Sequence, residues 1–165
     1  MNRIIPIFLC LFLYVSVLVQ GQDTTRLEAG HRIVRDLAAS EKHTYLIDLD
    51  AKQFVYGELN QKDMNVVISV LNPEGKQIGK FNITIGQERF YLETTEAGPY
   101  RIELSPFRFT NSSVDSGEYV IEIKQVESLG DTPGKQIDQL LNALYPSDWP
   151  GGAVAAHHRR HAVRD

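Results

Sequence analysis

Catalysis by a serine nucleophile needs a base within hydrogen-bond reach, so serines and histidines are the first residues to consider. No serine has a lysine three positions further on, and no Gly-x-Ser-x-Gly turn occurs. Two histidines, His31 and His43, fall in the part of the chain with strand-like patterning. Both stand at expected strand starts, where a surface histidine is the ordinary explanation. The sequence therefore predicts that this chain is not an enzyme and has no catalytic residue.

Metal binding is the second chemistry to test. His157 and His161 have the spacing that puts two ligands on one helix face. Arg159 and Arg160 stand between them and repel cations, so we interpret residues 157–165 as a disordered basic tail. Calcium needs several oxygens at one point, and no acidic pair has EF-hand spacing. We expect solvated turns, and no metal or cofactor, at the acidic pairs Asp48 and Asp50, Glu93 and Glu96, and Asp115 and Glu118.

Ligand binding through aromatic side chains is the third kind of chemistry to test. Phe107 and Phe109 flank Arg108 in a long loop between two expected strands, and exposed aromatic side chains mark contact surfaces. They are our candidate ligand-binding residues. Tyr56 and Tyr91 could join them in one aromatic binding platform, although core packing is the expected role of most of these four residues. The ligand remains open between a carbohydrate and a peptide.

The first 21 residues predict export. Arg3 precedes an apolar run over residues 7–19, which is short for a membrane span, and Val19-Gln20-Gly21 follows. We expect cleavage after Gly21, a secreted or periplasmic location and no membrane attachment afterwards; an uncleaved anchor is the alternative. Cys10, the only cysteine, lies in the apolar run, so the mature chain would have no disulfide. The formal net charge of -4 argues against a nucleic-acid partner.

The elements that would position any site are short strands. Alternating or apolar runs occur at 43–49, 53–59, 64–71, 77–83, 88–94, 100–104 and 119–125, separated by turns such as Asn72-Pro73-Glu74-Gly75. We place Val67 and Ile102 in the core. This pattern predicts an all-β fold, an antiparallel sandwich or jelly roll of about seven or eight strands.

One C-terminal amphipathic helix should follow the sandwich. Thr132 can cap it, and Pro133 suits its first position. Its apolar stripe comprises Ile137, Leu140, Leu141 and Leu144. A short amphipathic helix needs a docking surface. We expect none within a closed sandwich, which indicates that a further domain is the partner.

Two segments resemble known families. Residues 26–125 resemble bacterial pre-peptidase C-terminal-like β-sandwich domains, through Leu27-Glu28-Ala29-Gly30, 41–45, 70–76, 98–104 and 117–121. That family implies a sandwich with a binding, folding or spacer role beside secreted hydrolases. Residues 137–141 and 149–155 look like the opening of a serine β-lactamase-like hydrolase domain. That family's Ser-x-x-Lys would lie beyond this chain, which then reads as truncated or frameshifted.

These arguments divide the chain into four parts. Residues 1–21 are the predicted signal peptide, and residues 22–128 the accessory sandwich. Residues 129–156 are the predicted linker, helix and start of a truncated hydrolase-like domain, and residues 157–165 the tail. The expected function is an exported non-catalytic accessory module of a serine hydrolase; the alternative is a stand-alone carbohydrate- or peptide-binding module. The expected partners are a cell-surface polymer, a peptide or a hydrolase domain.

Overall fold

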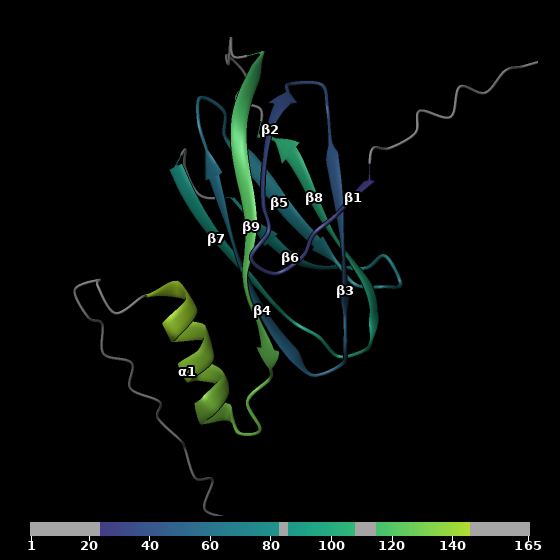
Figure 1. The fold of residues 1–165 in the computed structure, drawn as a ribbon, viewed down its shortest axis with the longest axis vertical. Coiled ribbons are helices and arrows are strands. Elements are labelled where there is room, and N and C mark those ends of the chain that lie inside the picture. Colours follow the sequence, from purple (N-terminus) through teal and green to yellow (C-terminus); the bar gives the residue numbers. More distant parts are fainter. Residues whose placement is uncertain (1–23, 83–85, 108–114, 146–165) are drawn as a thin grey trace, which may run out of the picture.

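Two β-sheets pack face to face in the computed structural model, which describes residues 24–82, 86–107 and 115–145 (Figure 1). Within these residues the fold is the predicted all-β sandwich with one C-terminal helix. Sheet A has the spatial order β1 (Thr24–Arg26), β3 (His43–Leu49), β8 (Gly98–Pro106), β5 (Val66–Leu71) and β6 (Gln77–Phe81). Sheet B has the order β2 (Arg32–Ala38), β9 (Ser116–Ser128), β4 (Gln53–Gln61) and β7 (Gly86–Glu93).

The described residues contain nine strands, one more than the upper expectation. The strand most easily missed is β1, whose three residues Thr-Thr-Arg have no apolar alternation. Parallel pairing with β3, about 20 positions further along the chain, holds β1 in an extended conformation. The register runs from Thr24 opposite Thr44 to Arg26 opposite Leu46. The other neighbouring strands pair antiparallel. A short turn explains this direction for β5 and β6, whereas the remaining pairs join strands that are not consecutive in the chain.

The core lies between the sheets and is made by the alternate residues of each strand. Tyr45, Ile47 and Leu49 share the inward face of β3, as predicted. The inward trios of β8 and β9 are also confirmed: Tyr100, Ile102 and Leu104, and Tyr119, Ile121 and Ile123. On β5, Val66, Ile68 and Val70 belong to the core cluster. Val67 is buried but does not belong to that cluster, because it projects from the opposite face of the strand.

Helix α1 (Pro133–Leu144) begins as the sequence predicts. Thr132 Oγ1 accepts a hydrogen bond from Lys135 N at 3.4 Å, and Pro133 occupies the first helical position. The helix lies along the outer face of sheet B (Figure 1). No helix among the described residues is long and apolar enough to cross a membrane.

The expectation that the helix has no partner within the sandwich is wrong. Leu140 and Ala143 pack against Phe54 and Tyr56 on β4. These two aromatic side chains form an apolar surface on the side of sheet B that faces away from the core, which the strand pattern of 53–59 did not reveal. Ile137 remains 38% exposed, so the sandwich covers only part of the helical stripe.

Polar contacts also fasten the middle and the C-terminal end of α1 to the sandwich. The Gln139 side chain donates to Glu127 Oε1 at 2.6 Å and to the Ser128 carbonyl at 2.8 Å, and its Oε1 accepts from Gly130 N at 2.7 Å. At the C-terminal end, Arg89 Nη1 on β7 donates to the Leu144 carbonyl at 2.9 Å. The last turn of α1 contains no basic residue, so Arg89 provides the cation that a helix C-terminus favours.

Candidate functional site

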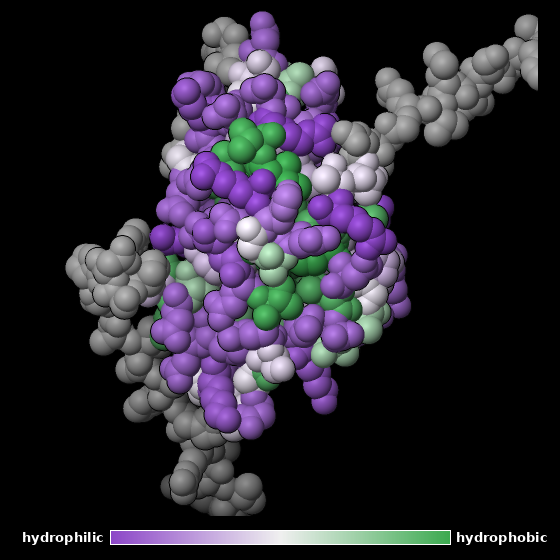
Figure 2. Space-filling view, viewed as in Figure 1, coloured by the Kyte–Doolittle hydropathy of each residue, from purple (hydrophilic) through white to green (hydrophobic). Residues whose placement is uncertain are grey.

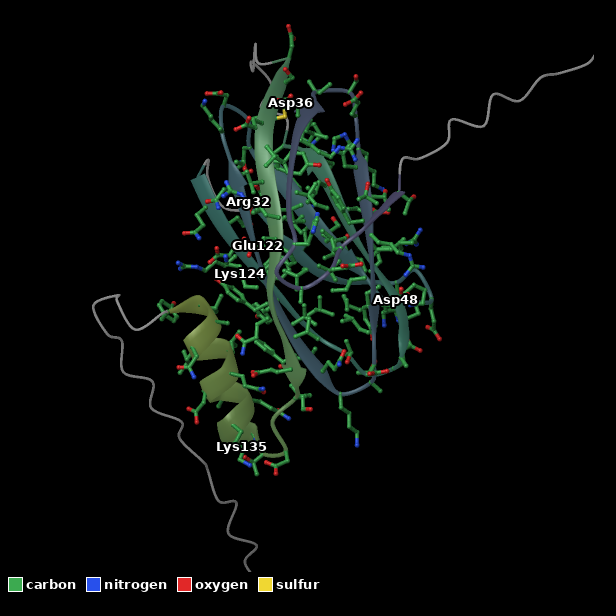
Figure 3. The ribbon with its side chains drawn as sticks, viewed as in Figure 1. Arg32, Asp36, Asp48, Glu122, Lys124 and Lys135 are labelled. Atoms are coloured by element: carbon green, nitrogen blue, oxygen red, sulfur yellow. The ribbon has the colours of Figure 1, made fainter. Side chains whose placement is uncertain are left out.

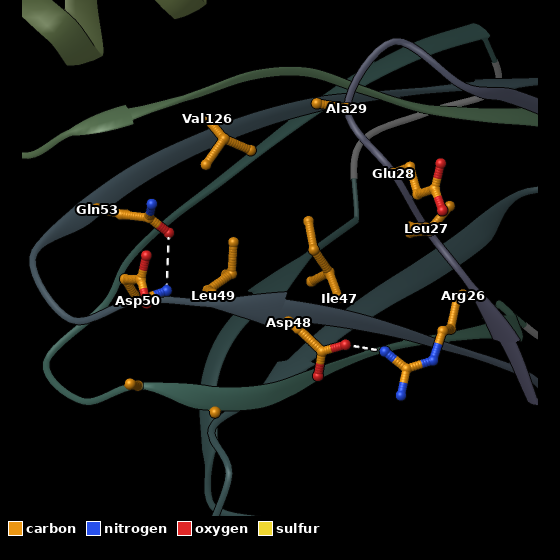
Figure 4. A pocket seen from close by; sticks show the side chains of 12 residues that line it. Arg26, Leu27, Glu28, Ala29, Ile47, Asp48, Leu49, Asp50, Gln53 and Val126 are labelled. Atoms are coloured by element: carbon orange, nitrogen blue, oxygen red, sulfur yellow. Dashed lines mark hydrogen bonds and ion pairs between the residues drawn. The ribbon is translucent and has the colours of Figure 1, made fainter.

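A cleft of about 580 Å³ opens on the flank of the sandwich, between β3 of sheet A and β9 of sheet B (Figure 4). The chain crosses from β1 to β2 at one end of this cleft, through Leu27, Glu28 and Ala29. The turn from β3 into β4, with Asp50 and Gln53, borders its other end. In space-filling view the same flank shows hydrophobic surface among hydrophilic side chains (Figure 2).

The cleft exists because β3 and β9 extend beyond the segments that pair with them on this side of the sandwich. The edge of β3 is paired as far as Leu46, whose carbonyl accepts from Leu27 N at 2.8 Å. The edge of β9 is paired as far as Ile123, which bridges Ala29 and accepts from Gly30 N at 2.8 Å. Among the described residues, nothing pairs with this edge of β3 at 47–49 or of β9 at 124–128.

A β-bulge in β9 shapes the wall of the cleft. The pairing with β4 shifts between Tyr56 and Gly57, which leaves Lys124 as an extra residue on β9. A bulge of this kind bends the strand and reverses which alternate residues face the core. Before it, Ile123 is buried in the core; after it, Val126 packs against the core and Glu127 turns toward α1.

Gly57 allows this local arrangement. A Cβ at this position would lie 2.3 Å from Cζ of Phe90, so the ring occupies the space of a side chain. The phenyl group of Phe90 is fully buried in the core. The strand can therefore carry its irregularity at Gly57 without opening a void beneath it.

The floor of the cleft is aliphatic and its rim is charged. Leu27, Ile47 and Leu49 are buried core residues, and Val126 joins them from β9. On the rim, Arg26 forms an ion pair with Asp48 (Figure 4). Asp48 lies on the flank of sheet A away from α1 and its Lys135 (Figure 3).

Two carboxylates remain on the rim besides that pair. Glu28 and Asp50 have no ion-pair partner among the described residues and stand at opposite ends of the cleft (Figure 4). The main chain of Asp50 is fixed: its N–H donates to Gln53 Oε1 at 2.9 Å, and its carbonyl accepts from Thr94 Oγ1 at 2.6 Å. The rim therefore holds two negative charges beyond the neutral Arg26–Asp48 pair, one of them on a fixed turn.

The predicted aromatic residues do not line this cleft. Phe107 follows β8 at the end opposite Gly98, which does line it. The phenyl group is half-buried, and Phe107 N donates to the Asn65 carbonyl at 2.7 Å. Phe109 lies outside the described residues. A binding role for these two residues stays a prediction, at a place separate from the cleft.

His43 is not the surface histidine that the sequence suggested; only 7% of it is exposed. As the first residue of β3 it points inward, where Nδ1 lies 2.5 Å from Tyr119 Oη. Tyr119 Oη in turn lies 2.5 Å from Tyr45 Oη, and both tyrosines are buried. Nε2 lies 3.7 Å from Glu41 Oε2. This network satisfies polar groups that the core would otherwise leave unpaired. His31 is exposed, as expected.

The outer face of sheet B has a polar cluster beside α1. Tyr56 Oη donates to Glu58 Oε1 at 2.6 Å, and Arg89 Nε lies 3.7 Å from the same carboxylate oxygen. Burial, and then the hydrogen bond to Glu58, raise the pKa of Tyr56. The hydroxyl is therefore protonated and donates at neutral pH. Within the described residues no group of three or more His, Cys, Asp or Glu could hold a metal ion; His157 and His161 lie outside them.

Comparison with known proteins gives structural likenesses only. No family model and no curated protein matches the chain. Among solved structures, it is similar to PliG of Aeromonas hydrophila, a periplasmic inhibitor of g-type lysozyme, with a TM-score of 0.48 and 15% identity over 61% of this chain and 96% of that one. It is also similar to the pre-peptidase C-terminal domain of a Bacillus anthracis collagenase, with a TM-score of 0.47 and 13% identity over 62% of this chain and 96% of that one.

A family 6 carbohydrate-binding module is more distant, with a TM-score of 0.34 and 11% identity over 61% of this chain and 97% of that one. One of these likenesses is to the sandwich family that residues 26–125 resemble. None of the three supports the β-lactamase-like segment.

Proposed function

We propose that this chain is an exported, non-catalytic β-sandwich module that binds an external ligand in the cleft between β3 and β9. The observation that carries the proposal is the cleft itself: a concave site with a buried aliphatic floor, a few charged groups and unpaired strand edges. Binding sites commonly combine an apolar lining with a small number of placed polar groups. The predicted signal peptide supports export.

The contacts of His43 support a role without catalysis. Its two ring nitrogens face Tyr119 and Glu41, and both tyrosine hydroxyls of this network are buried away from solvent. A nucleophile must be reachable by its substrate. We expect no turnover of a chromogenic cephalosporin or of nitrophenyl acetate; turnover that one serine substitution abolishes would show that the module is an enzyme.

The link to a serine hydrolase stays a prediction. It relied partly on α1 needing a partner outside the sandwich, and the packing of Leu140 and Ala143 on β4 removes that reason. The remaining argument is the resemblance of residues 137–155. Reading the downstream DNA in every frame for a strand, a glycine turn and Ser-x-x-Lys tests it.

Filling the cleft tests the binding proposal. Ala97 lines the cleft and is exposed, so Ala97→Trp should obstruct it without disturbing the core. Thr95→Trp, two residues away, exposed and outside the lining, is the matched control. The exported protein would be tested for retention on cellulose, chitin and peptidoglycan, and on immobilised peptides. We expect Ala97→Trp, and not Thr95→Trp, to reduce retention on one of them at least tenfold, which is about 1.4 kcal/mol. Retention unchanged by Ala97→Trp on every material would contradict the proposal.

A further inference from the structure

No described residue pairs with the cleft-facing edge of β3 at 47–49, and the main-chain groups that this edge presents to the cleft can be identified. Successive residues of a strand direct their N–H and C=O groups to alternate edges. Leu46 directs its carbonyl toward Leu27, so Asp48, two residues on, presents its N–H and C=O to the same edge. Ile47 and Leu49 pair instead with Tyr100 and Gly98 on β8. An exposed strand edge of this kind is a template for pairing with another chain.

We infer that the ligand of this cleft is an extended polypeptide with basic side chains, which adds a strand to β3 beyond the point where β1 ends. The inference rests on the proposed function and names its ligand class. Strand addition obtains affinity from main-chain hydrogen bonds and specificity from pockets for alternate side chains. The cleft offers both, because the Asp48 main chain lies at its rim and the aliphatic floor lies beneath it (Figure 4).

The general spacing of strands and sheets leads us to expect room for one added strand. Neighbouring strands in a sheet lie about 4.8 Å apart, and packed sheets lie about 10 Å apart. A peptide paired with β3 would therefore fill the space toward β9. Its alternate side chains would meet Leu27, Ile47 and Val126, and the intervening ones would point to the rim.

The charges on the rim of the cleft favour basic residues at the peptide positions whose side chains point to the rim. Arg26 and Asp48 neutralise each other, and Glu28 and Asp50 then leave two negative charges at opposite ends. Lysine or arginine at the intervening positions would complement them. Among the described residues that line the cleft there is no aromatic ring on which a sugar could stack, which favours a peptide over a carbohydrate.

A heptapeptide of sequence Thr-Val-Lys-Val-Thr-Val-Lys, capped at both ends and labelled for fluorescence polarisation, is the probe. We expect it to bind the exported full chain at low ionic strength, and its glutamate counterpart not to bind. Two further versions of the peptide carry N-methyl groups on alternate residues, and the second version methylates the residues that the first leaves unmodified. Strand addition requires that one version abolishes binding and the other does not, because only alternate N–H groups face β3. Equal effects of the two versions would overturn the inference.

Protein variants and amide exchange complete the test. Glu28→Gln and Asp50→Asn should each weaken binding about two- to fivefold, the range for an exposed charge pair. Glu74→Gln and Glu93→Gln, at exposed carboxylates outside the cleft, should leave binding unchanged. The Asp48 amide should exchange at least tenfold more slowly with bound peptide, and the amide of Gln87, on β7, should not change.

The outcomes separate the inference from the proposed function. If the heptapeptide fails to bind at millimolar concentration while Ala97→Trp blocks retention on cellulose, chitin or peptidoglycan, the cleft is a binding site and the peptide inference is wrong. If Ala97→Trp affects none of the materials or peptides, both are wrong. Peptide binding that Ala97→Trp leaves intact would overturn the assignment to this cleft.

Discussion

Whether α1 belongs to the sandwich can be decided with two substitutions on the same helix. Leu140 packs on the apolar surface made by Phe54 and Tyr56, whereas Ile137 is 38% exposed. Leu140→Ala removes three carbon atoms; at about 0.8 kcal/mol for each fully buried methylene, a half-buried leucine should lose about 1 to 2 kcal/mol of docking free energy. Ile137 does not belong to the cluster on Phe54 and Tyr56, and alanine has the higher helix propensity, so the effect of Ile137→Ala should stay within about 0.5 kcal/mol.

Amide exchange and urea denaturation measure the two effects. A loss of 1 to 2 kcal/mol corresponds to about a 5- to 30-fold faster opening of α1, seen in its exchanging amides. If the helix unfolds together with the sandwich, the urea midpoint falls as well. Equal effects of the two substitutions, or a larger effect of Ile137→Ala, would refute the docking through Leu140. The second result would restore the hypothesis that a following domain contacts the other side of the helix.

Three further predictions concern the core, the pH dependence and the mature end. Ile102→Ala should cost about 2 to 4 kcal/mol in urea denaturation, because Ile102 is fully buried between the sheets; Val67→Ala, which removes two carbon atoms from a buried side chain on the opposite face of β5, should cost about 1 to 2 kcal/mol. The raised pKa of Tyr56 means that its unfolded form loses its proton first, near pH 10, so stability should fall as pH rises above 10, and Tyr56→Phe should flatten that fall. A slope unchanged by Tyr56→Phe would contradict this. Mass spectrometry of the exported protein should find Gln22 at its N-terminus, and an intact Met1 would contradict the predicted cleavage.

The strands could be predicted because their alternation is local. The expected strand at 43–49 coincides with β3, and the expected start at 53 coincides with β4. β1 could not be found in this way, because Thr-Thr-Arg has no periodicity and is extended only through its pairing with β3. The inward faces of β8 and β9 followed from the same period of two.

The cleft left one signal in the sequence that alternation alone does not interpret. Apart from Val120, which faces away from the core, the apolar positions of β9 run Tyr119, Ile121, Ile123 and then Val126, so their spacing changes from two to three. That change is the bulge at Lys124, and it marks the wall of the cleft. Long-range pairing determines where β1 stops covering the edge of β3 and where β2 stops covering the edge of β9. No local sequence pattern predicts these two points.

The burial of His43 could have been anticipated from its neighbours. Tyr45 and Tyr119 both fall on faces predicted to point inward, and a buried tyrosine hydroxyl needs a hydrogen-bond partner. His43 shares the inward face of β3 with Tyr45 and supplies such a group. A histidine that alternates in step with the buried residues of a strand, near two inward-facing tyrosines, is better interpreted as part of a core hydrogen-bond network than as a surface residue.

The crossing at residues 27–29 explains why the cleft has both open edges and charge. To pass from sheet A to sheet B, the chain must leave β3 and join the β9 side, so one edge in each sheet loses its cover below the crossing. Uncovered edges invite pairing between copies of the same chain, and charged side chains are a common defence. Glu28 and Asp50 place like charges at this edge in every copy, which opposes self-pairing through it. The same two charges attract a basic strand, so the feature that keeps identical chains apart also selects the proposed ligand.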